Sequence, residues 1–392
     1  MIKQVLGWST RSEAPVHFAF TQEQEQLRAT VLAMLARRPA ERPRAPEEAD
    51  PGFDAVLWRR LAGELGAQAL AVPEEYGGHG FGLLESNLVV EALADGLVHG
   101  PFLGSAVIAA HAVLAAGDPA ACARLLPGIA TGRTVAALAW AEHGGWWRIG
   151  AQATTATRRG DAWSLDGDKV LVLDGEQADV VLVVAETGRG PALFELDRSA
   201  LAGSVRRETP MDSGRRSAAL RLVSAPAVLV GAEGRGAELL ARTLDVACAA
   251  IAAEQVGAAA RCLRDTVAYT KVRVQFGRPI GAFQAVKHRL ADLYVRLESA
   301  RSLSYAASWA VAVRSPDAAA LAAAAKSYGS QAYAAIAAEG VQLHGGIGVT
   351  WEHGAHLHLK RAHATAQLFG DPVAQRVRLG GLIGVASNGS EA

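Results

Sequence analysis

The sequence has no excess of charge of either sign, because its 39 Lys and Arg residues are balanced by 39 Asp and Glu residues. A nucleic-acid-binding protein normally carries a basic patch or stripe, and a neutral balance argues against that class. Half of the residues are hydrophobic and 20% are charged. This composition is typical of globular chains and excludes a wholly disordered one.

Cysteine is also scarce. Cys122, Cys248 and Cys262 are odd in number, far apart and without metal-ligand spacing, so we expect buried free thiols in a reducing cytoplasm and no metal site. The first 20 residues lack the apolar core of a signal peptide. Apolar runs such as 318–325 are far shorter than the roughly 20 residues of a membrane-spanning helix. The sequence therefore predicts a cytoplasmic protein without membrane insertion.

Two patterns allow a more specific interpretation that we do not favour. His353, His356, His358 and His363 are close enough for zinc ligands, yet no accompanying carboxylate pattern supports a metal, and a helix with polar His residues fits better. The segment 227–240 resembles a strand, a glycine-rich turn and a helix, but its glycines give GxxGxG rather than GxGxxG. We expect it to be a turn joining two parts of the chain.

The chain divides by pattern into helical, β-rich and helical parts, with a polar tail at 386–392. Residues 1–133 read as helical: Thr21 and Gln24 form a capping-box pattern, and Gly66 follows a stripe of leucines as a helix end. Residues 134–233 contain short β-prone runs, and Asp166-Gly167 predicts a hairpin between two of them. Several short strands in succession favour a small antiparallel barrel or sandwich.

Residues 234–385 are rich in Ala and contain three stretches long enough for substantial helices: 236–272, 283–313 and 316–343. Long helices with short connections indicate a bundle. The sequence thus predicts an α+β multidomain fold: an N-terminal helical domain, a central small antiparallel β domain and a C-terminal four-helix bundle.

Two segments of the last part combine arginine with glycine. They are RVQFGRPIGAFQAVKHRLAD (273–292) and LHGGIGVTWEH (343–353). Glycine lets backbone N–H groups approach a phosphate closely, and Arg is an always-charged bidentate donor to it. Each segment therefore indicates an anionic cofactor, with two ordinary helix–helix loops as the alternative.

Taken together with residues 61–97 and 166–179, these segments resemble the acyl-CoA dehydrogenase family, in the family's order and over most of the chain. The resemblance implies FAD bound between the β domain and the bundle, and usually a tetramer. It implies that Arg273, Phe276 and Gln284 contact the FAD of a neighbouring subunit. It also places Gln342, Gly345 and Gly346 near the ADP end of FAD, and Val172 and Leu173 beside the isoalloxazine ring.

The family removes the α-proton of an acyl thioester with a Glu carboxylate while the β-hydrogen leaves as hydride to the flavin, which carries the redox step. This chain departs from that pattern. Most members carry the Glu in a Tyr-Glu-Gly-Thr motif, where this chain has Phe369. A minority carry it on the first long helix of the bundle, where this chain has Ala247. Glu254 and Asp371 are the carboxylates left as candidate bases, each with a structural role as its alternative.

Three functions stay open. The chain is an active dehydrogenase using Glu254 or Asp371, a catalytically silent subunit that binds flavin or covers substrate in a heteromer, or a flavin monooxygenase or oxidase of the same fold. The expected partners are an acyl-CoA substrate of fatty acid or steroid side-chain metabolism, and electron-transfer flavoprotein or a similar acceptor. The expected assembly is a homotetramer or an α2β2 heterotetramer.

Overall fold

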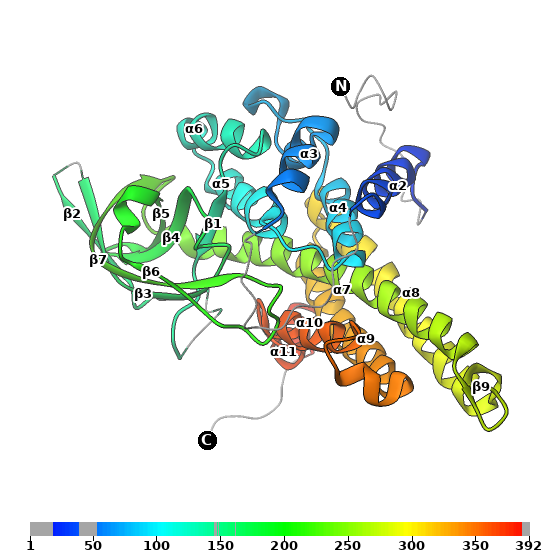
Figure 1. Ribbon diagram of the computed structural model, residues 1–392. Coiled ribbons are helices and arrows are strands. Elements are labelled where there is room, and N and C mark those ends of the chain that lie inside the picture. Colours follow the sequence, from blue (N-terminus) through cyan, green and yellow to red (C-terminus); the bar gives the residue numbers. More distant parts are fainter. Residues whose placement is uncertain (1–18, 39–52, 145–146, 148, 161, 386–392) are drawn as a thin grey trace. The chain divides into compact units, whose positions relative to one another are not determined.

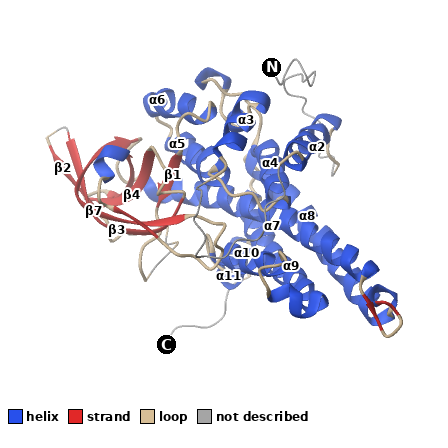
Figure 2. Ribbon diagram, in the orientation of Figure 1, coloured by secondary structure: helices blue, strands red, loops and turns tan. Residues whose placement is uncertain are grey.

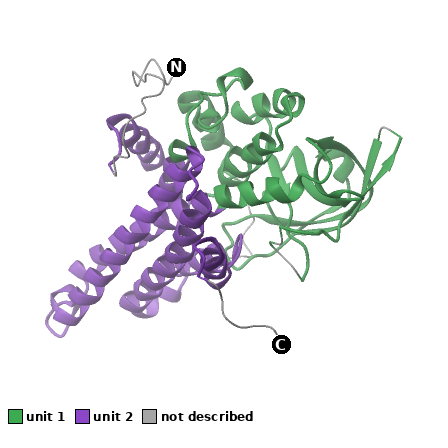
Figure 3. Cartoon of the chain, turned by 180° about the vertical axis from the view of Figure 1, so that it is seen from behind, with its two compact units in different colours: residues 1–5, 51–86, 99–247 green, residues 6–50, 87–98, 248–392 purple. Residues whose placement is uncertain are grey.

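The computed structural model describes residues 19–38, 53–144, 147, 149–160 and 162–385. The chain forms two compact units (Figure 3). Unit 1 comprises residues 1–5, 51–86 and 99–247, and unit 2 comprises residues 6–50, 87–98 and 248–392. Figures 1 and 2 show most of the strands in unit 1 and long helices in unit 2.

Seven of the described strands of unit 1 form one sheet. They are β1 (Ala136–Ala139), β2 (Thr155–Arg159), β3 (Ala162–Leu173), β4 (Val180–Thr187), β5 (Gly190–Asp197), β6 (Val205–Arg207) and β7 (Ser217–Val230). Most pairings are antiparallel, whereas β4 pairs parallel with both β1 and β2. Apolar side chains such as Val181, Val183 and Phe194 form the core of this sheet. Burial of these β-branched and aromatic residues stabilises the sheet by about 25 cal/mol per Å² of apolar surface.

The hairpin predicted at Asp166-Gly167 is wrong. β3 runs without interruption from Ala162 to Leu173 and pairs along its length with β7. Gly167 has φ 144°, and the register with β7 shifts between Leu165 and Gly167. The glycine therefore makes a bulge in a continuous strand, because only a residue without Cβ adopts this φ easily.

The described helices of unit 1 pack as short segments. They are α3 (Ala55–Leu65), α5 (Ala110–Ala116), α6 (Pro119–Ala130), the π-helix η3 (Phe102–Ala109), and the first residues of α4 (Leu83–Asp95) and of α7 (Gly236–Val272). Gly66 ends α3 with φ 57°, in the left-handed conformation predicted for it. Its N–H bonds to the carbonyls of Leu61 and Ala62, so it satisfies otherwise free helix-end acceptors.

Unit 2 contains α2 (Gln22–Ala36), α8 (Gln284–Ala312), α9 (Ala318–His344), α10 (Ala355–Gln367) and α11 (Pro372–Leu382), with the later parts of α4 and α7. The capping box predicted for Thr21 and Gln24 is present at the start of α2. Small residues allow the helices to approach closely. At Gly257 of α7, an added Cβ would lie 2.0 Å from the Glu91 carbonyl oxygen of α4.

One helix among the described residues, α7, is long and apolar enough to span a membrane by length and composition. Its most apolar window is 89% buried inside the protein. A core helix of a water-soluble bundle has the same properties, so this observation is weak evidence for a membrane.

Candidate functional site

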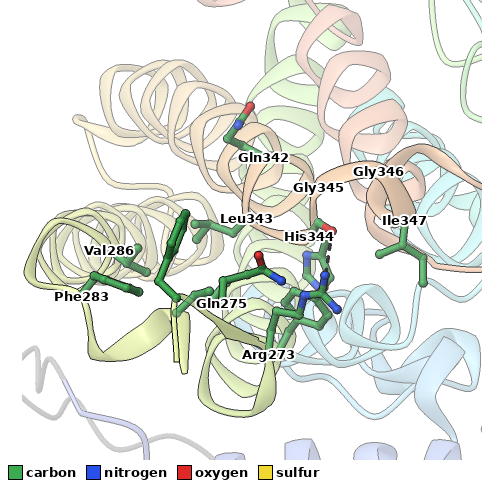
Figure 4. Close-up of a pocket in the computed structure, with 13 residues that line it drawn as sticks. Arg273, Gln275, Phe283, Val286, Gln342, Leu343, His344, Gly345, Gly346 and Ile347 are labelled. Atoms are coloured by element: carbon green, nitrogen blue, oxygen red, sulfur yellow. Dashed lines mark hydrogen bonds between the residues drawn. The ribbon is translucent and has the colours of Figure 1, made fainter. Parts of the chain in front are cut away.

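A pocket of about 570 Å³ lies in unit 2 where the end of α7, the start of α8 and the end of α9 meet (Figure 4). Gln275 also lines it, from the short strand β8 (Val274–Gln275), which pairs with β9 (Arg278–Pro279). The sequence-predicted residues that line it are Arg273, Phe276, Gln342, Gly345 and Gly346. Segments about 70 residues apart in the chain are thus brought to one pocket, as expected for a single ligand site.

The Gly345–Gly346 turn gives the pocket an open stretch of backbone. Gly345 follows α9 with φ 61° and ψ −144°, a conformation that disfavours residues with a Cβ. A Cβ built at Gly345 or at Gly346 would meet no atom within 4 Å. The space beside both residues is therefore available to a ligand, while the Gly345 N–H donates to the Gln342 carbonyl and holds the turn at the end of α9.

Arg273 supplies a positive charge at the same pocket. It follows the last residue of α7 and is exposed, and its backbone is fixed because its carbonyl accepts a hydrogen bond from Ile280 N at 2.8 Å. Among the described residues, no carboxylate lies within ion-pair distance of its guanidinium group. The guanidinium is thus free to make bidentate bonds to an anionic ligand. Together with the open glycine turn, this fits the diphosphate of FAD.

Of the other predicted cofactor contacts on this side, Phe276 lines the pocket and Gln284 does not. Phe276 is 91% exposed and has φ 52°, and its ring contacts Phe283 edge-on with centroids 6.2 Å apart. In Figure 4, Phe283 and Val286 lie at one side of the pocket and Ile347 at the other. Gln284 begins α8 but does not line the pocket, and its Nε2 lies 3.4 Å from His288 Nε2.

Val172 and Leu173 lie in unit 1, at the end of β3. Both are buried, with 1% and 6% exposure. The residues flanking them, Leu171 and Asp174, have φ values of 52° and 58°, and the register with β7 shifts between Lys169 and Val172. This irregular strand end is of the kind found beside functional sites. The flavin contact of these two residues stays a prediction.

Glu254 is buried in α7 and forms an ion pair with Arg361 of α10. The Glu254 Oε1 to Arg361 Nη1 distance is 3.5 Å, and both side chains are less than 10% exposed. Gln255, the next residue, donates from Nε2 to Ser330 Oγ at 2.9 Å. The helix is thus tied to α9 and α10 at this level. The carboxylate is thus engaged by a side chain of a neighbouring helix, and this contact favours the structural role.

Asp371 caps α11. Its Oδ1 accepts a hydrogen bond from Ala374 N at 2.7 Å, the usual arrangement of an N-cap carboxylate. The contact satisfies a free backbone donor and gives the carboxylate a structural function. Both candidate bases therefore have structural partners, and their catalytic role stays a prediction.

Ala247 and Phe369, at the two customary base positions, are buried with 0% and 4% exposure. The backbone around Phe369 is anchored by hydrogen bonds that do not involve the Phe369 side chain. Gln375 Nε2 donates to the Phe369 carbonyl at 2.6 Å, and Lys326 Nζ donates to the Gly370 carbonyl at 3.2 Å. Burial lowers the pKa of Lys326 to about 8. The loop keeps a defined conformation with a residue that cannot accept a proton.

One pocket histidine, His344, was not predicted from the sequence as a site residue. His344 lines the pocket and stacks between Tyr269 and His353, with centroids 4.2 Å away on each side. His353 lies in a turn before α10, whereas His356 and His358 lie on α10 and His363 is exposed. Within the described part of the chain, no group of three or more His, Cys, Asp or Glu residues could hold a metal ion. The only hint in the sequence was the cluster of His residues after position 352. One of these residues, His353, contacts the ring of His344.

The helical–β–helical order, with Arg273 and a glycine turn at one pocket of the bundle, is the arrangement that the resemblance to acyl-CoA dehydrogenases predicts. Residues 21–133 match the acyl-CoA dehydrogenase N-terminal domain, and residues 234–377 match the acyl-CoA dehydrogenase C-terminal domain. The chain belongs to the acyl-CoA dehydrogenase family. Its members are flavoprotein oxidoreductases that typically use FAD and typically form tetramers.

Several relatives match over nearly their whole length. The chain is 37% identical over 360 residues to acyl-CoA dehydrogenase IpdE2 of Mycolicibacterium smegmatis, covering 92% of this chain and 98% of that protein. The solved structure of the Tcur3481-Tcur3483 steroid ACAD is similar with a TM-score of 0.82 and 32% identity, covering 93% and 98% of the two chains. That of the ChsE4-ChsE5 complex from Mycobacterium tuberculosis has a TM-score of 0.82 and 29% identity, covering 95% and 100%.

Proposed function

We propose that this chain is one subunit of a two-chain, FAD-dependent acyl-CoA dehydrogenase, and that a partner chain supplies the catalytic base. The observation that carries the proposal is the pair of buried side chains at the customary base positions, Ala247 and Phe369. Neither can accept a proton. The engagement of Glu254 by Arg361 and of Asp371 by Ala374 N supports the same view.

The likeness to two solved proteins whose names join two chains, Tcur3481-Tcur3483 and ChsE4-ChsE5, agrees with a heteromer. In this assembly, unit 2 holds the ADP part of FAD through Arg273 and the Gly345–Gly346 turn. FAD supplies the hydride acceptor when bound. The steroid ACAD among the similar structures makes a steroid-derived acyl-CoA the first substrate to test. A homomeric dehydrogenase that uses Glu254 or Asp371 is the alternative.

We expect the purified chain alone to show no bleaching of the flavin absorbance when it is titrated anaerobically with acyl-CoAs. Co-expression with a family member that carries Glu at the position of Phe369 or of Ala247 should restore bleaching and raise FAD content. The measurement is the visible absorbance of flavin per protein in both preparations. Bleaching by the chain alone would contradict the proposal. Its loss in Glu254→Gln, but not in Asp371→Asn, would then assign Glu254 as base.

We expect Arg273→Gln to weaken FAD binding about tenfold to a hundredfold, because a charge-assisted hydrogen bond contributes about 1.5–3 kcal/mol. The matched control is Arg296→Gln, since Arg296 is an exposed arginine of α8 that does not line the pocket. FAD affinity is measured from flavin fluorescence on titration of the apoprotein complex. Equal affinities of the two variants would show that Arg273 does not contact the cofactor.

A further inference from the structure

Three aromatic rings from three elements stack beside the pocket. Tyr269 comes from α7, His344 ends α9, and His353 lies in the turn that precedes α10. The centroids of Tyr269 and His344 are 4.2 Å apart with an interplanar angle of 29°, and those of His344 and His353 are 4.2 Å apart with an angle of 37°. The two imidazoles therefore close the base of the loop 344–353, which contains the Gly345–Gly346 turn.

Hydrogen bonds show which ring nitrogen carries a proton in each of these two histidines. His344 Nδ1 donates to the Gly340 carbonyl at 2.6 Å, whereas His353 Nδ1 accepts from Ala355 N at 3.1 Å. Because Nδ1 of His353 is an acceptor, it carries no proton in this arrangement. Its acceptance also satisfies the first N–H of α10, which would otherwise lack an intrahelical partner.

His356, a third histidine of this region, is also placed where a second ring proton is disfavoured. His356 Nδ1 donates to the His353 carbonyl at 3.0 Å. Its Nε2 is buried and has no hydrogen-bond partner among the described residues. Burial, above all, lowers the pKa of His356, and Lys360 on the same helix lowers it further. A proton on Nε2 would place a positive charge in a site without an acceptor.

The charges that face His353 come from every element packed against it. Burial lowers the pKa of His353 most, followed by His344 of α9; Asp265 of α7 raises it and His356 of α10 lowers it again. Protonation of Nδ1 would also break the bond to Ala355 N and place a positive charge at the N-terminus of α10. The helix dipole disfavours a cation there. Acid therefore acts against the stacked arrangement.

We propose that His344 and His353 are positioning residues that clasp the Gly345–Gly346 turn in its ligand-binding conformation only while His353 Nδ1 is unprotonated and accepts the Ala355 N–H. A proton on His353 Nδ1 removes the acceptor for the Ala355 N–H, and with it the bond that fixes the His353 ring against His344. As the pH falls through the titration of His353 the clasp opens, and the pocket loses the ordered Gly345–Gly346 turn that lines it. The identity of the ligand as FAD rests on the proposed function; the clasp itself does not.

The test compares His353→Phe with the wild type, because Phe keeps a ring for the stack and cannot take up a proton. FAD release from the purified complex is followed by flavin fluorescence at about pH 7.5 and about pH 5.5, on either side of the histidine range. We expect the wild type to release FAD about tenfold faster at the lower pH, the order of effect of losing one hydrogen bond. His353→Phe should release it at nearly the same rate at both.

His363→Phe is the matched control, since His363 is an exposed residue of α10 outside the stack; its pH profile should follow the wild type. His353→Gln, which retains an acceptor-capable side chain without titrating, is the second variant and should also give a flat profile. Equal pH profiles for the wild type and both His353 variants, or tighter retention of FAD by the wild type in acid, would overturn the proposal.

Backbone hydrogen exchange separates the clasp from the ligand. On the full chain without partner, amide exchange in residues 345–349 is compared between the wild type and His353→Phe at each pH, so that intrinsic exchange cancels. We expect the wild type to exchange about tenfold faster than the variant at about pH 5.5 and equally at about pH 7.5. If this exchange difference is found but the protein binds no FAD at any pH, the clasp is supported and FAD is rejected as the ligand. Equal exchange at both pH values would overturn the clasp.

Discussion

Arg361→Met is expected to lower the free energy of unfolding by about 3–5 kcal/mol, because it leaves the Glu254 carboxylate buried without its cation. The guanidinium lies 3.5 Å from the carboxylate, and the two side chains are 4% and 6% exposed. Removal of one partner from such a pair is costly, since the remaining charge is not solvated. Urea unfolding followed by circular dichroism measures the change.

Two further variants test whether the loss of stability comes from the ion pair. Glu254→Gln combined with Arg361→Met removes both charges and should recover most of the lost stability, because the buried carboxylate charge is removed together with the guanidinium. Arg296→Met, at an exposed position of α8, should change stability by less than about 0.5 kcal/mol. A loss under about 1 kcal/mol in Arg361→Met would indicate a pair with the strength of a surface ion pair. The structural role of Glu254 would then be in doubt.

Lys169→Met is expected to destabilise the β-rich unit by about 3 kcal/mol, the lower end of the range for breaking a buried ion pair. Lys169 is 0% exposed, and its Nζ donates to Glu142 Oε1 at 2.6 Å and to Gln152 Oε1 at 3.0 Å. Glu142 also accepts from the N–H groups of Ala153 and Thr154, so it keeps partners in the variant. The exposed Lys271→Met is the control.

The same lysine gives stability a defined pH dependence. Burial lowers the pKa of Lys169 to about 8 from 10.5, although Glu142 acts to raise it. Between these values the unfolded chain binds the proton and the folded chain does not, so the free energy of unfolding rises with pH. We expect the Tm of the wild type to rise across this window, together with a contribution from Lys326, whose pKa is also lowered to about 8. Lys169→Met should rise less steeply; an unchanged slope would show that Lys169 keeps its ordinary pKa.

Glu142, the partner of Lys169, contributes to the pH dependence of stability at acid pH. Burial raises the pKa of Glu142, but the hydrogen bond and charge of Lys169 and two backbone N–H groups outweigh it and leave the pKa lowered. A carboxylate with a lowered pKa stabilises the fold above its unfolded pKa, and this contribution is lost as pH falls through the folded value. Lys169→Met should therefore flatten the acid limb as well.

Local pattern was enough to predict much of this protein. The capping box at Thr21, the left-handed end at Gly66 and the three long helices of the bundle depend on residues within a turn or two of one another. The hairpin at Asp166-Gly167 was wrong because the pairing of β3 with β7 overrides the local turn preference. A glycine can make either a turn or a bulge, and only the partner strand decides which one forms.

By itself, the sequence determined the helical–β–helical order and the residue types of an anion-binding pocket, since periodicity and glycine–arginine composition are properties of neighbouring residues. Only the tertiary structure decided that Arg273 and Gly345 line one pocket, and that Glu254 faces Arg361. It alone revealed that His344 and His353 stack. These pairs join residues far apart in the chain or across a turn, and a side chain's proton affinity and role depend on what tertiary packing places against it.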